Sequence, residues 1–309
     1  MKSVVKTITL FVCLTILSGC LGNNSNNESS ILGLLQPMEK SSIKIEYNLV
    51  NEEKLPIGAS KIGGDPDLPS DFEWLYYYGE SYRGVFDNYP LSFLAQINCK
   101  EISQYDKDSQ LPSEGMLYFF YELETMTWGF SPEDKGSAKV YYYPGDVSDL
   151  RRTELPSDLL EENRFPEMSI TFSTEKEFPD FEEFIEWHGI FDYEQYDEYN
   201  TEKSKLVPMV EEDSSITKLL GYANLIQGGV LLECELTSSG VYTGGEGFSV
   251  SEKQIEDALQ WQLLFQLDTI ITDNYSMYWG DSGRIYFYIK TEDLKAQNFD
   301  DVWLILQCY

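Results

Sequence analysis

The residue types that usually carry enzyme chemistry are few in this sequence. His188 is its only histidine, and no serine or cysteine lies in the Gly-x-Ser-x-Gly pattern of an activated nucleophile. A catalytic triad would therefore have to be built around His188. Because Phe181, Phe184, Ile185 and His188 recur at helical spacing, we expect His188 to cap a helix or to lie partly buried on it.

The sequence also lacks a specific motif for phosphate binding, for catalysis by paired carboxylates or for metal binding. The run Gly244-Gly245-Glu246-Gly247 carries an acid where a phosphate-binding loop has Lys-Ser/Thr, so it predicts a turn. Adjacent acids such as Glu182-Glu183 are expected by chance in a chain with 53 acidic residues. Two sets of side chains offer oxygens to calcium without the spacing of an EF-hand: Asp65, Asp67 and Asp71, or Asp273, Asn274 and Asp281. We predict no metal and no cofactor.

The cysteines indicate neither a disulfide framework nor a zinc site. Beyond the first 20 residues there are Cys99, Cys234 and Cys308, an odd number at wide spacing with no Cys-x-x-Cys or Cys/His pattern. Each stands in or beside an apolar run, which favours buried thiols. A single bridge from Cys308 to Cys234 or to Cys99 stays open as an alternative.

The N-terminal residues predict export and lipid attachment. A short basic start precedes the apolar run Thr7–Leu17, which is too short for a membrane span of about 20 residues. Leu17-Ser18-Gly19-Cys20 resembles the lipobox of bacterial lipoproteins, in which the cysteine receives a diacylglyceryl group. We expect a signal peptide at residues 1–19, a lipidated Cys20 with a flexible tether over residues 20–30, and anchorage on the exported side of the cell membrane. An ordinary secretory signal is the alternative.

Charge limits the partners of the chain. Its formal net charge is −31 at pH 7, and we expect no nucleic-acid partner, because phosphates need Lys and Arg to neutralise them. With 42% hydrophobic and 15% aromatic residues, the chain is nevertheless too rich in core-forming side chains for a disordered acidic tail.

Four blocks of sequence recur in the same order, which predicts an internal duplication. The pairs are KIGGDPDL from Lys61 with KLLGYANL from Lys218, FLAQIN from Phe93 with LLFQLD from Leu263, GMLYF from Gly115 with GRIYF from Gly283, and residues 138–143 with 301–309. Within one domain at 31–309, we place the first half at about 55–145, an acidic linker or elaboration at about 146–209, and the second half at about 214–309.

The repeated blocks have the alternating pattern of half-buried β-strands. Ile285, Phe287 and Ile289 fall on one face of their strand. The same alternation puts Phe93, Ala95 and Ile97 on one face in the first half, and Leu263, Phe265 and Leu267 on one face in the second. Gln96 and Gln266 then occupy the same phase, on the more polar face of each strand.

Helices are expected to be short and few. The predicted helices are Phe181 to His188, ending at Gly189; Ser251 to Gln260, with Ser249 as the cap; and an N-capped turn of helix from Thr291 to Leu294. The patterns together predict an α+β protein that is β-rich, with predominantly antiparallel or mixed sheets, an internal duplication of two similar halves and a few short helices.

The chain resembles the YwqG-like proteins, catalogued as a domain of unknown function with the number 1963. The similar motifs are Lys61–Pro69, Pro90–Ile97, Leu111-Pro112, Gly115–Phe120, Leu219–Tyr222, Trp279–Gly283 and Gln307-Cys308. The resemblance implies a β-rich α+β fold and no established activity. The chain departs from the family in its export signal, and in Trp74-Leu75 and Tyr222-Ala223, where the family has Trp-Pro and Tyr-Pro. A pocket shaped by these positions would differ from that of the family.

Binding is the predicted role, with Gln96, Gln266, Trp279 and Asp281 as candidate binding residues and no catalytic residue assigned. Partners would be the membrane, through a lipid on Cys20, and a basic protein or a glycan. The segment from Phe178 to Glu202, in which acids and aromatics alternate, is either that surface or, as its spacing favours, a helix with its aromatics turned inward. The alternatives are a carboxylate-based hydrolase of cell-wall glycans and an acidic self-protection protein that binds a basic toxin.

Overall fold

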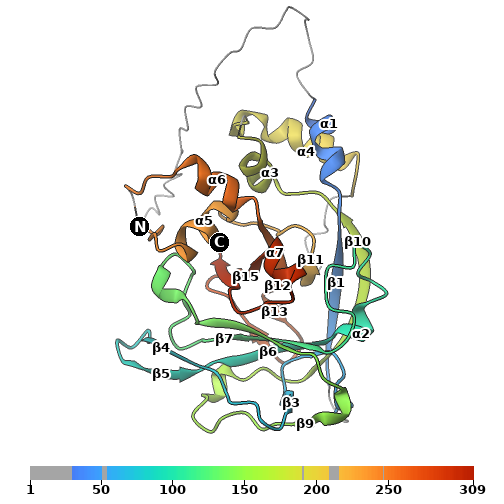
Figure 1. Cartoon of the computed structure of the whole chain (residues 1–309), viewed down its shortest axis with the longest axis vertical. Coiled ribbons are helices and arrows are strands. Elements are labelled where there is room, and N and C mark those ends of the chain that lie inside the picture. The colour runs from blue at the N-terminus through green and yellow to red at the C-terminus, as the bar shows by residue number, and fades with distance from the viewer. Residues whose placement is uncertain (1–29, 51–53, 190, 209–215, 246) are drawn as a thin grey trace, which may run out of the picture.

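A ten-stranded, strongly curved sheet that nearly closes on itself forms the centre of the protein (Figure 1). The computed structural model describes residues 30–50, 54–189, 191–208, 216–245 and 247–309. In sheet order the strands are β16 (Trp303–Gln307), β15 (Arg284–Lys290), β12 (Trp261–Asp268), β11 (Lys218–Leu220), β1 (Lys40–Leu49), β10 (Met168–Glu177), β2 (Lys61–Ile62), β6 (Ser92–Asn98), β7 (Met116–Tyr121) and β8 (Ala138–Tyr143). Neighbouring strands in this sheet pair antiparallel.

Smaller elements surround this sheet. The two-stranded ladders are β3 (Asp67–Pro69) with β9 (Leu150–Arg152), β4 (Tyr76–Glu80) with β5 (Phe86–Pro90), and β13 (Ile270–Ile271) with β14 (Ser276–Met277). The α-helices are α1 (Ile31–Leu35), α2 (Cys99–Ile102), α3 (Phe181–His188), α4 (Tyr196–Ser204), α5 (Leu231–Ser238), α6 (Glu252–Ala258) and α7 (Thr291–Lys295). The prediction of a β-rich protein with mostly antiparallel sheets and few short helices is confirmed.

The two longest strands, β1 and β10, pair over their full length at the middle of the sheet. On one side follow β11, β12, β15 and β16, and on the other β2, β6, β7 and β8. The registers also agree, because Lys218 pairs with Gln266 on one side and Lys61 pairs with Gln96 on the other. The segment 146–209, predicted to be a linker or elaboration, contributes the central strand β10.

The predicted alternation of β6 and β12 is wrong at one position in each strand. Both strands have a register irregularity, between Phe93 and Ala95 in β6 and between Leu263 and Phe265 in β12. An extra residue in one strand changes the face of the residues before it. Phe93 and Leu263 therefore lie outside the main core cluster, which contains Ala95 and Phe265.

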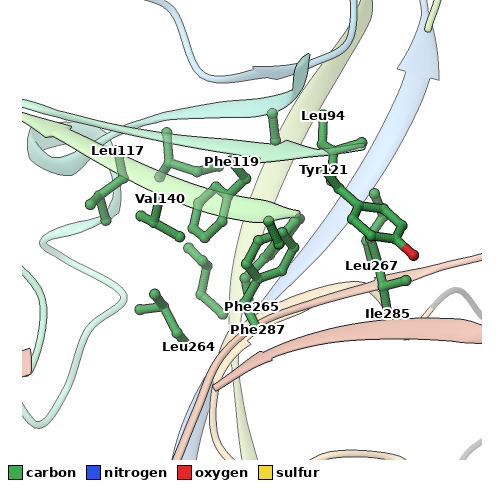
Figure 2. Packing of buried hydrophobic residues seen from close by; sticks show 14 of the residues in the cluster. Leu94, Leu117, Phe119, Tyr121, Val140, Leu264, Phe265, Leu267, Ile285 and Phe287 are labelled. Carbon is green, nitrogen blue, oxygen red and sulfur yellow. The ribbon is translucent and has the colours of Figure 1, made fainter. Parts of the chain in front are cut away.

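Three phenylalanines lie at the centre of the main core, on the inside of the curved sheet (Figure 2). The ring of Phe119 from β7 is 4.4 Å from that of Phe265 on β12 and 5.4 Å from that of Phe287 on β15, between centroids. In the order of the sheet, β7 lies on one side of the central pair β1 and β10, and β12 and β15 lie on the other. The sheet has therefore curved far enough for strands from both groups to share one core.

The second face of β15 is also buried, which the half-buried strand pattern did not predict. Tyr286 and Tyr288 are fully buried on that face. They belong to a cluster with Leu231 and Cys234 of α5 and Ala258 of α6. The helices thus cover this face of β15. Because tyrosine occurs both in buried and in exposed positions, the sequence alone did not indicate whether the face was covered.

The loop between β7 and β8 bridges to the far edge of the sheet. The backbone N–H of Leu306 on β16 donates to the carbonyl of Trp128, and Trp303 Nε1 donates to the carbonyl of Gly129, at 3.1 and 3.0 Å. Gly129 has φ of 86°, and a Cβ there would lie 2.1 Å from the Leu304 carbonyl oxygen. Only glycine permits this approach.

Of the three predicted helices, one ends where it was predicted to end, and the other two have a different N-cap from the predicted one. The helix α3 ends as predicted at Gly189, which has a left-handed conformation with φ of 63°. The cap of α6 is Ser251, not Ser249, because Ser251 forms the reciprocal capping box with Gln254. The helix α7 begins at Thr291, but its N-cap is Lys290.

Candidate functional site

Gln96 and Gln266, the first two candidate binding residues, lie at the centre of equivalent hydrogen-bond networks. The side-chain oxygen of Gln96 accepts from the backbone N–H of Asp67, and its amide donates to the carbonyl of Ala59, each at 2.8 Å. Gln266 accepts from the backbone N–H of Asn224 at 2.9 Å and donates to the carbonyl of Ile216 at 2.6 Å. Each amide thus ties a neighbouring loop to its strand.

A buried tyrosine completes each network. Tyr118 donates from its hydroxyl to the carbonyl of Asp67 at 2.5 Å, and Tyr286 donates to the carbonyl of Asn224 at 2.8 Å. Burial raises the pKa of Tyr286 well above its ordinary value. Since both glutamines are fully buried, they do not reach solvent and contact only groups of the protein in this state.

The other two candidate binding residues lie elsewhere. Trp279 is fully buried, and its Nε1 donates to the carbonyl of Asp268 at 3.0 Å. Asp281 is exposed, and its carbonyl accepts from the backbone N–H of Tyr309 at 3.2 Å. The structure therefore does not bring the four candidates together around one opening.

An open cavity does lie beside the second of these networks, where α4 approaches β1, β10 and β11. It has a volume of about 780 Å³. Its charged wall residues are Lys44, Lys176, Lys203, Lys218, Glu175, Glu177 and Asp180. Its other polar or aromatic wall residues include Phe178, Asn200, Ser204, Tyr222 and Asn224. It is a site of the kind that holds a small ligand by a few polar groups.

Each of three wall lysines has a carboxylate partner in the wall. The ammonium group of Lys218 is 2.7 Å from Glu177, and that of Lys203 is 2.7 Å from Asp180. The ammonium group of Lys44 is 3.4 Å from Glu175. Lys218 is the least exposed, at 5% of its side chain, while Lys203 and Lys44 are exposed by 21% and 22%.

The corresponding lysine of the other side, Lys61, does not line this cavity. Its side chain is fully buried, 3.4 Å from Glu167. Burial lowers the pKa of Lys61, although the nearby carboxylates of Asp67 and Glu167 oppose this. Arg152 from β9 fills the space next to it, with Nε 2.6 Å from Asp67 Oδ1. On one side of the sheet the ionic cluster around Lys61 is thus filled by Arg152, whereas on the other side the cluster around Lys218 borders the cavity.

Three carboxylates of α3 and α5 are buried, as in Glu183, or half-buried, as in Glu186 and Glu233. Burial raises the pKa of Glu183 and of Glu233 to about 7, and that of Glu186 to about 8. Glu186 accepts from the backbone N–H groups of Leu231 and Leu232, at the start of α5, at 3.3 and 3.0 Å. Of these three carboxylates, Glu186 joins α3 to α5, while Glu233 accepts from the hydroxyl of Thr243 at 2.9 Å.

His188 lies at the end of α3 in an aromatic environment. Its ring centroid is 4.6 Å from that of Phe184, and burial lowers its pKa. The aromatics of the 178–202 segment divide between two surroundings. Those turned into the core include Phe181, Phe184 and Tyr199, while Tyr193 and Tyr196 are exposed.

The residues proposed for calcium do not form a metal cluster. Within the ranges that the structure describes, no group of three or more His, Cys, Asp or Glu side chains is arranged to hold a metal ion. Asp67, for example, is buried against Arg152 and the amide of Gln96. Cys99, Cys234 and Cys308 are buried free thiols.

The sequence did not point to Lys44, Lys176 or Lys203 as functional residues. The available signal was the rarity of basic residues in an acidic chain, together with the repeat that contains Lys218. Tyr222 and Ala223, where the chain departs from the family pattern, do line the cavity.

The fold and the site thus define a β-rich α+β domain with an open cavity at the side of its sheet, whose wall includes charged side chains. Residues 60–308 match the family described as "Domain of unknown function (DUF1963)", and the chain belongs to this family. No curated protein matches the chain. In the part of the chain that the structure describes, no helix is both long and apolar enough to cross a membrane. Cys20 and residues 1–19 lie outside that part.

Proposed function

We propose that this chain is a membrane-anchored binding module whose cavity beside β1, β10, β11 and α4 takes a small ligand with an anionic group. The observation that carries the proposal is the position of four lysines around one cavity, in a chain with 22 basic and 53 acidic residues. Three of these lysines pair with acids of the wall, and Lys176 pairs with Glu39 at 2.5 Å, so the wall gathers ammonium groups that each have one carboxylate partner. An ammonium group has three donors, so a lysine that binds one carboxylate can also bind a ligand.

The comparison between the two sides of the sheet supports an anionic ligand. We infer that the sides are the copies of an internal duplication, because strand order, the positions of the glutamines and both strand irregularities agree. In the first copy Asp67 holds Arg152. In the second copy the uncharged Asn224 takes the place of Asp67 and lines the cavity. An acid that would bind a cation is thus absent from this position of the second copy.

The ion pairs of the wall favour binding over hydrolysis. A glycan hydrolase needs two carboxyl groups about 5 to 10 Å apart across a cleft, free to act as acid, base or nucleophile. Glu177 and Asp180 are instead each held by a lysine at 2.7 Å. Both carboxylates are therefore engaged by lysines and are not free for these roles.

Calorimetric titration of the purified full chain with succinate, glycerol phosphate and maltose tests the proposal. We expect the two anions to bind more weakly as salt is added, and maltose not to bind. Lys203→Gln should lower the affinity by about tenfold, equivalent to about 1.4 kcal/mol. Lys203 suits the test because it is partly exposed, so its loss should leave the fold intact.

Lys135→Gln is the matched control. It removes one charge from an exposed pair with Asp301, at 3.0 Å, remote from the cavity wall. Equal weakening by both substitutions would mean that the anions sense only the overall charge. Binding of maltose as tight as that of the anions, with no effect of Lys203→Gln, would contradict the proposed ligand class.

A further inference from the structure

The hairpin of β4 and β5 carries an exposed aromatic face. Its strands pair from Tyr76 with Pro90 to Glu80 with Phe86. Because side chains alternate along a strand, Tyr76, Tyr78 and Phe86 point to the same side. They are 46%, 63% and 59% exposed. The rings of Tyr78 and Phe86 lie 6.2 Å apart between centroids, so they form one continuous apolar surface.

The opposite face of the hairpin is fixed to the body of the protein. The hydroxyl of Tyr77 donates to the carbonyl of Glu133 at 2.9 Å. Gly79 lies so near the loop after β7 that a Cβ there would be 2.9 Å from Thr125 Cγ2. The backbone N–H of Tyr82, in the hairpin turn, donates to the carbonyl of Glu124 at 3.0 Å. The exposed face is therefore presented on a supported hairpin, which projects from the body in Figure 1.

Acidic side chains surround the aromatic face. Glu80 lies on the same face as Tyr78 and is exposed. Asp158 accepts from the hydroxyl of Tyr76 at 3.2 Å. Glu124 and Glu162 lie near the hairpin turn, where they interact electrostatically with Arg83. Arg83 itself binds the hydroxyl of Tyr82, with its Nε at 2.7 Å. The rim therefore has an excess of negative charge.

We propose that this face is a docking surface for a Lys- or Arg-rich segment of a protein partner. Cationic side chains stack on aromatic faces, and an interaction of this kind contributes about 0.5 to 2 kcal/mol. Tyrosine and arginine are also enriched among the residues that dominate interface energies. The acids of the rim and the net charge of −31 would increase the rate of association with a basic segment.

This surface is independent of the proposed cavity. The hairpin precedes β6 on one side of the sheet, whereas the cavity lies beside β1, β10, β11 and α4. No residue of the hairpin is in the cavity wall. A variant of the hairpin should consequently leave the binding of succinate unchanged, and Lys203→Gln should leave the docking of a basic segment unchanged.

Fluorescence anisotropy of a labelled deca-arginine peptide, titrated with the purified full chain, tests the docking surface. We expect salt-sensitive binding that Tyr78→Ala with Phe86→Ala weakens at least about tenfold. Both side chains are exposed, so the thermal melting temperature should not change. Glu80→Gln should weaken binding less and reduce its dependence on salt.

The matched control is Tyr242→Ala with Ile271→Ala, since these side chains are 58% and 63% exposed at other places. It should bind the peptide like the unaltered chain. Equal affinity of the hairpin variant and the unaltered chain would overturn the proposal, because the peptide would then follow the overall charge. Sedimentation that shows a dimer lost in the hairpin variant would also overturn it, because the face would then hold a second copy.

Discussion

At the scale of single residues, Gln96 and Gln266 connect each side strand to a loop. Both side chains use their oxygen and their amide on backbone groups. A buried backbone group that loses its partner costs about 1 to 3 kcal/mol. Sequence alternation found these positions as a matched pair, and their role in ligand binding stays a prediction.

Gln96→Leu should therefore lower the free energy of unfolding by about 2 to 6 kcal/mol, because two backbone groups, the N–H of Asp67 and the carbonyl of Ala59, each lose a partner. Urea unfolding monitored by tryptophan fluorescence measures the change. Gln104→Leu is the control: Gln104 is exposed, and exposed substitutions usually change stability by less than about 0.5 kcal/mol. Equal stability of the two variants would show that the Gln96 network contributes little.

At the scale of elements, the contact between α3 and α5 includes a carboxyl group with a raised pKa, that of Glu186. Glu183 lies near Asp180, and Glu186 lies near Glu183 and Glu233, while Lys40 opposes the shift at Glu183. Burial and the neighbouring acids raise the pKa of Glu186 from 4.5 to about 8. The folded form thus retains a proton that the unfolded form loses above about pH 4.5.

The stability contributed by Glu186 should be complete below pH 4.5 and be lost as the pH rises through 8. Glu186→Gln cannot ionise, and it keeps one acceptor oxygen where the carboxyl group uses one oxygen for the N–H of Leu231 and the other for that of Leu232. We expect this variant to gain at least about 1 kcal/mol over the unaltered chain between pH 5 and pH 9, since one pKa unit equals about 1.36 kcal/mol. Thermal melting across this range measures the gain.

The exposed residue Glu198, on α4, supplies the control for this experiment. Glu198→Gln should leave the pH profile of stability parallel to that of the unaltered chain. A parallel profile for Glu186→Gln as well would show that Glu186 is ionised in the folded protein at neutral pH.

The elements also show what the sequence could and could not predict. Ile285, Phe287 and Ile289 are buried in the main core as their spacing predicted, because alternation reports the face of a strand directly. The irregularities at Phe93 and Leu263 were missed, because they depend on the partner strand. The coverage of Tyr286 and Tyr288 by α5 and α6 depends on helices from other parts of the sequence.

At the scale of the whole molecule, the cavity could not be predicted from the sequence, because its wall also depends on contacts between distant parts of the chain. Its lysines come from β1, β10, β11 and α4, and the curvature of the sheet decides which of these elements meet. The repeats indicated blocks that form strands, whereas neither the order of the strands nor the inclusion of β10 was predicted. Local patterns therefore predicted the strands, and long-range pairing determined the site.

The proposed location of the molecule depends on Cys20, and a substitution tests it. Cys20→Ser should abolish incorporation of labelled palmitate in a bacterial host and move the chain from the membrane fraction to the soluble fraction, because two acyl chains on one residue provide stable anchoring and a hydroxyl cannot receive them. Cys13→Ser is the control, since it removes another cysteine from the same N-terminal segment and should keep the label. Membrane binding that survives Cys20→Ser would mean that an uncleaved apolar segment, and not a lipid, holds the chain. A soluble, unlabelled parent chain would instead favour an ordinary secretory signal.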